Sequence, residues 1–175
     1  MSLIEGYDVK PFHELMAEYR RQMEKGDIRD AYKGLIEFMM RLRSNFKAKH
    51  PDFVVSGSLY PGYMDMTYFS FFPESLELRK LKVAVVFLHD TCRFEAWLAG
   101  YNKQIQSRYW TSFKKSGWNK YRMPAATKGA DSILEHVLDG NPDFRDLDAL
   151  SDRIESGTLD FIKNVEDFLS KTPDV

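Results

Sequence analysis

The sequence has little cysteine, no long hydrophobic run and, over one stretch, no acidic residue. Cys92 is the one cysteine among 175 residues, which excludes an internal disulfide and any cysteine-rich zinc site. The longest apolar run covers six residues, 83–88, whereas a helix needs about 20 to cross a bilayer. The N-terminal residues lack the basic-then-apolar order of a secretory signal. We therefore expect no membrane span and a cytoplasmic location.

The composition is that of a folded, soluble protein. Hydrophobic residues make up 43% of the chain and charged residues 29%, which argues against disorder. The length suffices to bury a hydrophobic core, and no internal repeat, low-complexity tract or linker interrupts it. We expect a single α+β domain over residues 1–175.

Helical patterning dominates the first fifty residues. Apolar side chains recur at three- and four-residue spacing, as Phe12, Leu15, Met16, Tyr19 and Met23, and Gly26 ends this helix. Asp27 caps a second helix, which ends before Pro51. The short join between them predicts an antiparallel helical hairpin.

The middle of the chain is predicted to form a β-sheet. Four segments are rich in β-branched and aromatic residues and predict strands: 53–60, 63–72, 81–89 and 92–98. Pro61 and Gly62 suit a type II turn, and residues 89–91 suit a second reversal, so the last three strands should be antiparallel. Residues 83–88 are apolar on both faces and predict a central strand. Residues 73–80 form a helical turn or a loop.

The C-terminal third predicts helices. Residues 101–115 have helical spacing and precede a loop over 116–129. Residues 132–135 match the capping-box pattern and predict a short helix, which two acidic helices follow over 143–155 and 158–171. The expected fold is α+β, with a mostly antiparallel sheet of three to four strands between an N-terminal helical hairpin and C-terminal helices.

Three stretches of the central third resemble a known family. They read GYMDMTYFSF, LKVAVVFLH and RFEAWLAGYNKQIQSRYW. These are similar to a small, uncharacterised bacterial family described as a domain of unknown function. The resemblance implies a soluble bacterial α+β protein and assigns no catalytic residue.

Charge is segregated along the chain. Residues 1–95 have a net charge of 0, residues 96–130 of +7 with no acid, and residues 131–175 of −8. Such asymmetry concerns partners and internal contacts rather than fold.

The acid-free stretch, residues 96–130, is called the basic segment below. It interleaves cations with aromatic rings: Lys103, Arg108, Lys114, Lys115, Lys120, Arg122 and Lys128 with Tyr101, Tyr109, Trp110, Phe113, Trp118 and Tyr121. Cations neutralise phosphates and rings stack on bases, so the mixture suits a nucleotide or single-stranded nucleic acid. Alternatively, the rings face the core and the acidic C-terminal helices fold back as internal counterions.

One strand carries a polar face. Arg93, Glu95 and Trp97 alternate with the apolar side, on which Cys92 is expected to be buried. The polar face is either a hydrogen-bonded network or part of a ligand site. Our leading interpretation is a soluble module that binds an anionic small molecule or nucleic acid through five residues: Tyr63, Arg93, Trp97, Lys103 and Arg108.

A carboxylate pair gives an alternative. Asp65 and Glu95, followed by a glutamine-bearing helix, resemble the restriction-endonuclease-like nucleases, which implies catalytic Asp65 and Glu95 holding Mg²⁺. The lysine expected two residues after Glu95 is replaced by Trp97, and Lys103 is the available substitute. Otherwise Asp65 belongs to a turn, and Glu95 pairs with Arg93 or with a neighbouring strand on an exposed face. Outside this alternative we expect no cofactor and no metal.

A third interpretation is a protein–protein interaction module, in which the acidic helices dock a basic partner.

Overall fold

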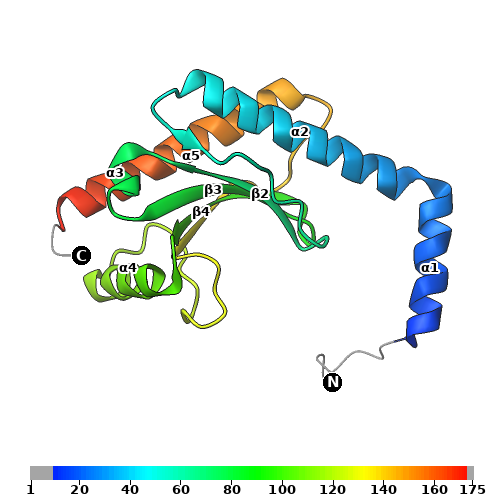
Figure 1. The fold of residues 1–175 in the computed structure, drawn as a ribbon, viewed down its shortest axis with the longest axis horizontal. Helices are drawn as coiled ribbons and strands as arrows, with labels where there is room; N and C mark the ends of the chain where they lie inside the picture. The colour runs from blue at the N-terminus through cyan, green and yellow to red at the C-terminus, as the bar shows by residue number, and fades with distance from the viewer. Residues whose placement is uncertain (1–9, 173–175) are drawn as a thin grey trace. The chain divides into compact units, whose positions relative to one another are not determined.

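The computed structural model describes residues 10–172 (Figure 1). The chain divides into two compact units between Glu37 and Phe38. That the two units form a single domain stays a prediction. Among the described residues, no helix combines the length and apolar character needed to cross a membrane.

The first unit contains helix α1 (Phe12–Lys25) and the start of helix α2 (Asp27–Lys49). Gly26, with a φ of 86°, is the one residue between them. The predicted antiparallel hairpin is wrong because such a hairpin needs a loop of about two to five residues. No residue of α1 is buried.

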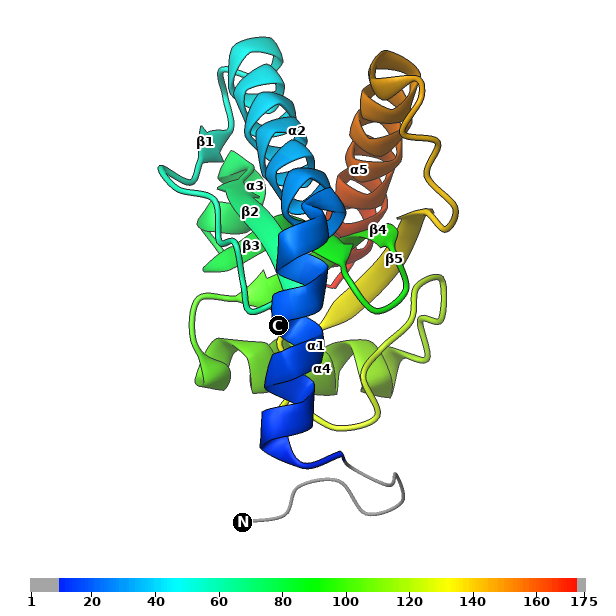
Figure 2. The same ribbon diagram turned by 90° about the vertical axis from the view of Figure 1, so that its right-hand side faces the viewer.

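The second unit is built on a five-stranded antiparallel sheet in the order β1-β2-β3-β4-β5. Its strands are β1 (Val54–Val55), β2 (Met66–Phe72), β3 (Leu81–Leu88), β4 (Arg93–Gly100) and β5 (Leu134–Asp139). Its helices, besides the second half of α2, are α3 (Glu74–Glu77), α4 (Lys103–Ser116) and α5 (Leu147–Ser170). Figures 1 and 2 show α2 and α5 over one face of the sheet and α4 beyond the other.

The α+β class and the central place of β3 agree with the sequence, but the strand count does not. The sheet has five strands rather than three to four, and β1 is only two residues long. The additional strand is β5, where the capping-box pattern predicts a helix. Ser132 does donate to Glu135 at 2.5 Å, but the chain there is extended, since Ile133 N–H bonds to the Leu98 carbonyl.

Helix α5 is continuous across the break predicted near residue 157. Gly157 lies inside the helix, and a Cβ atom there would come within 2.9 Å of Leu138 Cδ2. The glycine therefore permits close packing of α5 on the segment of β5 and does not end the helix.

Cys92 also departs from expectation. It lies in the turn before β4, has a φ of 48° and is exposed. The strand begins one residue later, at Arg93, so the alternation that predicted burial does not extend to Cys92.

Aromatic side chains fill the core between the sheet and the helices above it. Phe46 of α2 packs against Phe69 and Phe71 of β2, and Phe161 of α5 is fully buried. Burial of a large apolar side chain stabilises by about 1.5–3 kcal/mol, so this layer holds the sheet in place.

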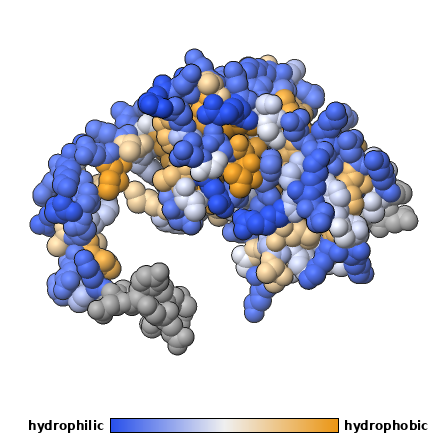
Figure 3. Space-filling view, turned by 180° about the vertical axis from the view of Figure 1, so that it is seen from behind, coloured by the Kyte–Doolittle hydropathy of each residue, from blue (hydrophilic) through white to orange (hydrophobic). Residues whose placement is uncertain are grey.

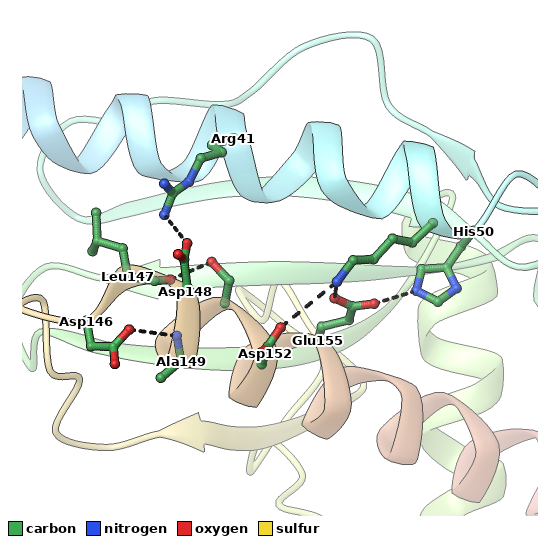
Figure 4. A network of polar contacts seen from close by, with 10 residues as sticks. Arg41, His50, Asp146, Leu147, Asp148, Ala149, Asp152 and Glu155 are labelled. Carbon is green, nitrogen blue, oxygen red and sulfur yellow. Dashed lines mark hydrogen bonds and ion pairs between the residues drawn. The ribbon is translucent and has the colours of Figure 1, made fainter.

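Ion pairs link α2 to α5 at the surface of this layer (Figure 4). Glu155 accepts from Lys49 at 2.6 Å and contacts His50 at 3.0 Å, while Arg41 lies 3.6 Å from Asp148. The acidic C-terminal helix therefore finds counterions on α2. Fewer of its carboxylates remain for a basic protein partner.

Candidate functional site

The face of the sheet that turns away from α2 and α5 carries a cavity of about 600 Å³. The register between β3 and β4 determines which side chains form the floor of this cavity. Trp97 lies opposite Ala84, and Ala99 lies opposite Lys82, so these side chains project to one face. Small residues at Ala84 and Ala99 leave room above the strands, and larger side chains form the walls.

Aromatic rings form one wall. Tyr60 precedes the Pro61–Gly62 turn and exchanges two backbone hydrogen bonds with Tyr68 of β2, at 2.8 and 2.9 Å. Their ring centroids lie 4.9 Å apart. With Trp97, these rings give the cavity flat apolar surfaces.

The first turn of α4 forms the opposite, polar end. Gly100 allows this approach, because a Cβ atom there would lie 2.6 Å from the Gln106 backbone nitrogen. The buried Gln106 accepts from Gly100 N–H at 3.3 Å and donates to the Ala130 carbonyl at 2.8 Å. Asn102 caps the helix by accepting from Ile105 N–H at 2.9 Å. A helix N-terminus carries partial positive charge, which favours an anion nearby.

Two lysines line the cavity, and they differ in their partners. Lys103 donates to the Ala130 carbonyl at 2.7 Å and lies 3.8 Å from Asp131 Oδ1. Lys82 is half-buried, and its ammonium has no hydrogen-bond or ion-pair partner among residues 10–172. An ammonium group so placed is available to a ligand anion.

Arg93, Glu95 and Trp97 share a face of β4, and they form a hydrogen-bonded network. Glu95 is fully buried; one carboxylate oxygen accepts from Arg93 Nε at 2.7 Å, and the other from the Trp97 indole at 2.6 Å. Arg122 lies 3.8 Å from Glu95 and contacts Glu135. The network occupies the Glu95 carboxylate, and Trp97 also lines the cavity.

The remaining predicted residues lie apart. Tyr63 is 90% exposed, and its N–H donates to Asp65 Oδ1 at 2.8 Å within a tight turn. Backbone N–H groups of Tyr63 and Met66 hold the pKa of Asp65 below its usual value. Arg108 is exposed, with its guanidinium 5.9 Å from the Tyr109 ring centroid, and does not line the cavity.

Asp65 and Glu95 do not approach one another in the sheet. Tyr68 is level with Val86, which is level with Glu95, so Asp65 lies three residues farther along and two strands away. With strands about 4.8 Å apart and a rise of about 3.3 Å per residue, their Cα atoms are roughly 14 Å apart. Carboxylates that share Mg²⁺ each need an oxygen within about 2.1 Å of the ion. No metal-holding group of three His, Cys, Asp or Glu occurs within residues 10–172. This geometry does not favour the nuclease.

Four of the six rings that interleave with cations in the basic segment pack against the protein interior or α5, while Tyr101 is 45% exposed. Tyr109 and Phe113 are buried, and Trp118 stacks on Phe168 of α5 at 4.9 Å. Tyr121 packs against Phe161 at 4.8 Å. Such rings serve the core and are not a stacking platform for bases.

Sequence reasoning missed several cavity residues, among them Tyr60, Tyr68 and Lys82. The signal for two of them was alternation, because Lys82 and Tyr68 occupy face positions set by the strand register. Tyr60 reaches the cavity through a bridge outside the regular strands, which local pattern does not reveal.

No curated protein and no solved structure matches the chain. Residues 12–169 match a protein family whose description is "Domain of unknown function (DUF7000)". This match covers the cavity, the sheet and all the described helices but for the last residue of α5. The chain therefore belongs to the DUF7000 family.

Proposed function

We propose that the protein binds a small anionic ligand with a flat apolar body in the cavity between the sheet and α4. The observation that carries the proposal is the half-buried Lys82, whose ammonium has no partner among the described residues and which lines an aromatic cavity. An ammonium group with no hydrogen-bond or ion-pair partner in the protein can pair with an anion that enters the cavity.

The dimensions and chemistry of the cavity support this class of ligand. Its volume of about 600 Å³ falls within the range of small-molecule sites. The rings of Tyr60, Tyr68 and Trp97 suit a planar group, while Lys82 and the N-terminus of α4 suit a phosphate or carboxylate. A mononucleotide combines both features.

Binding of single-stranded nucleic acid by the basic segment has less support. Three of the rings that would stack on bases, Phe113, Trp118 and Tyr121, pack against α5. Two of the segment's cations, Lys103 and Arg122, pair with acidic residues. The cavity is thus the better site for an anion.

The test is titration of the full chain with adenosine 5′-monophosphate and with an aromatic carboxylate, followed by tryptophan fluorescence and calorimetry. We expect saturable binding that changes the tryptophan fluorescence, because Trp97 lines the cavity. Lys82→Met keeps the apolar stem and removes the charge. A hydrogen bond to a charged group contributes about 1.5–3 kcal/mol, so affinity should fall by about tenfold or more.

Lys115→Met is the matched control, since Lys115 is exposed near the end of α4 and does not line the cavity. Its affinity should stay within about twofold of the parent protein. Absence of saturable binding, or equal losses in the two variants, would contradict the proposal.

A further inference from the structure

Helix α1 presents an apolar stripe that no described residue of its own unit covers. Phe12 is 77% exposed, Tyr19 55%, and Leu15 and Met16 each 45%. Residues at three- and four-residue spacing lie on one side of a helix, so these four side chains and Met23 form one continuous surface, which we call the α1 stripe. Figure 3 shows hydrophobic residues among hydrophilic ones on α1, the column at the left.

The charges of α1 are divided between its two halves. Residues 12–18 contain Glu14 and Glu18 and have a net charge of −2 with neutral histidine. Residues 19–25 contain Arg20, Arg21 and Lys25 against Glu24, a net charge of +2. Two such helices placed antiparallel bring each acidic half beside the basic half of the other.

We propose that the α1 stripe is a self-association surface, on which α1 of a second copy of this chain packs antiparallel. Contact between two stripes removes both sets of apolar side chains from water. The antiparallel direction follows from the charge division, because a parallel pair would set Glu14 and Glu18 of both copies side by side. This inference is independent of the cavity and its ligand.

The size of the helix sets the expected strength. Helix α1 has 14 residues and is therefore about 21 Å long. Two helices of this length bury less than the roughly 1,200 Å² of a standard stable interface. The dimer should be weak, and its population should rise with protein concentration.

Other occupants fit α1 less well. A helix that binds an anionic lipid surface is rich in Lys and Arg on its polar face, whereas α1 has zero net charge. The acidic and basic halves of α1 are also complementary to those of a second, antiparallel α1. An unrelated partner has no reason to carry the same division of charge. The second copy is the occupant that the charge pattern favours.

The experiment is sedimentation velocity of the full chain over a hundredfold range of concentration. We expect the average mass to move from monomer toward dimer. Leu15→Asp, in the centre of the α1 stripe, should keep the chain monomeric throughout the range. Lys47→Glu, an exposed change in the last turn of α2, is the control and should associate like the parent.

Charge reversal tests the pairing itself. One variant carries Glu14→Lys and Glu18→Lys, and the other carries Arg21→Glu and Lys25→Glu. Each alone makes both halves of α1 alike in sign and should be monomeric, while an equimolar mixture should associate again. Both variants also remove the Glu18–Arg21 pair within α1, so circular dichroism must show equal helicity.

Three results would overturn the proposal: a parent chain that stays monomeric, a Leu15→Asp chain that still dimerises, or a mixture that fails to associate. A monomeric chain that co-sediments with vesicles of phosphatidylcholine and phosphatidylglycerol would also overturn it, in favour of a lipid surface.

Discussion

Replacing Arg93 by methionine should destabilise the protein through the carboxylate that it leaves behind. Glu95 is fully buried, and Arg93 approaches one of its oxygens through Nε at 2.7 Å and Nη2 at 2.6 Å. Breaking a buried ion pair from one side costs about 3–5 kcal/mol. The Trp97 indole and Arg122 remain near the second oxygen, and Arg93 itself is 29% exposed. The loss should therefore lie near the lower end, at about 3 kcal/mol.

Urea denaturation with linear extrapolation measures this loss, and for a chain of this size it should lower Tm by about 6–12 °C. The double variant Arg93→Met with Glu95→Leu removes both charges. Because the buried carboxylate is then gone, the double variant should be more stable than Arg93→Met alone. A cost below about 0.5 kcal/mol for Arg93→Met, the range of an ordinary surface substitution, would refute the buried-pair reasoning.

Two further perturbations test the packing around the site. Gly100→Ala should weaken ligand binding and lower the free energy of unfolding by about 1–3 kcal/mol, because its Cβ would lie 2.6 Å from the Gln106 backbone nitrogen. Gly34→Ala, a change with open space around it, should be neutral or stabilising. Equal effects of the two variants in calorimetry and urea melts would contradict this account. Burial lowers the pKa of His89 and His136 in the folded state. Their contribution to the free energy of unfolding should therefore be complete above the unfolded-state pKa of about 6.5. It should be lost as the pH falls from there toward the folded-state pKa values. A urea midpoint that stays constant between pH 7.5 and 5.5 would count against that assignment.

The sequence predicted features that depend on neighbouring residues. Alternation placed Arg93, Glu95 and Trp97 on one face of a strand, and their hydrogen bonds agree with that placement. The apolar run 83–88 predicted a central strand, and β3 is the middle strand of five. These features follow from periodicity within one segment.

Features that depend on distant residues were not accessible in this way. Gly157 looks like a helix end, and only its contact with Leu138 explains why it lies inside α5. Ser132 and Glu135 match the capping-box pattern, yet they bond side chain to side chain instead of capping backbone N–H groups, and backbone pairing with β4 makes the segment a strand. Tertiary contacts override local propensity at such positions.

The candidate site shows the same division. Arg93 and Trp97, each two residues from Glu95 on the same strand, hold its carboxylate, whereas the approach of Arg122 from the basic segment depended on the fold. That Lys82 would line a cavity depended on the positions of Tyr60 and α4. The sequence pattern predicted which side chains share a face of a strand. The residues that lie across the cavity from that face are determined by the fold.

The most direct test of the cavity proposal compares a phosphate-bearing ligand with its neutral counterpart. The affinities of the parent and of Lys82→Met are measured for adenosine 5′-monophosphate and for adenosine at one ionic strength. If the Lys82 ammonium holds the anion, the parent should prefer the monophosphate by about tenfold or more, and Lys82→Met should lose most of that preference. An equal preference in the two proteins would contradict the account.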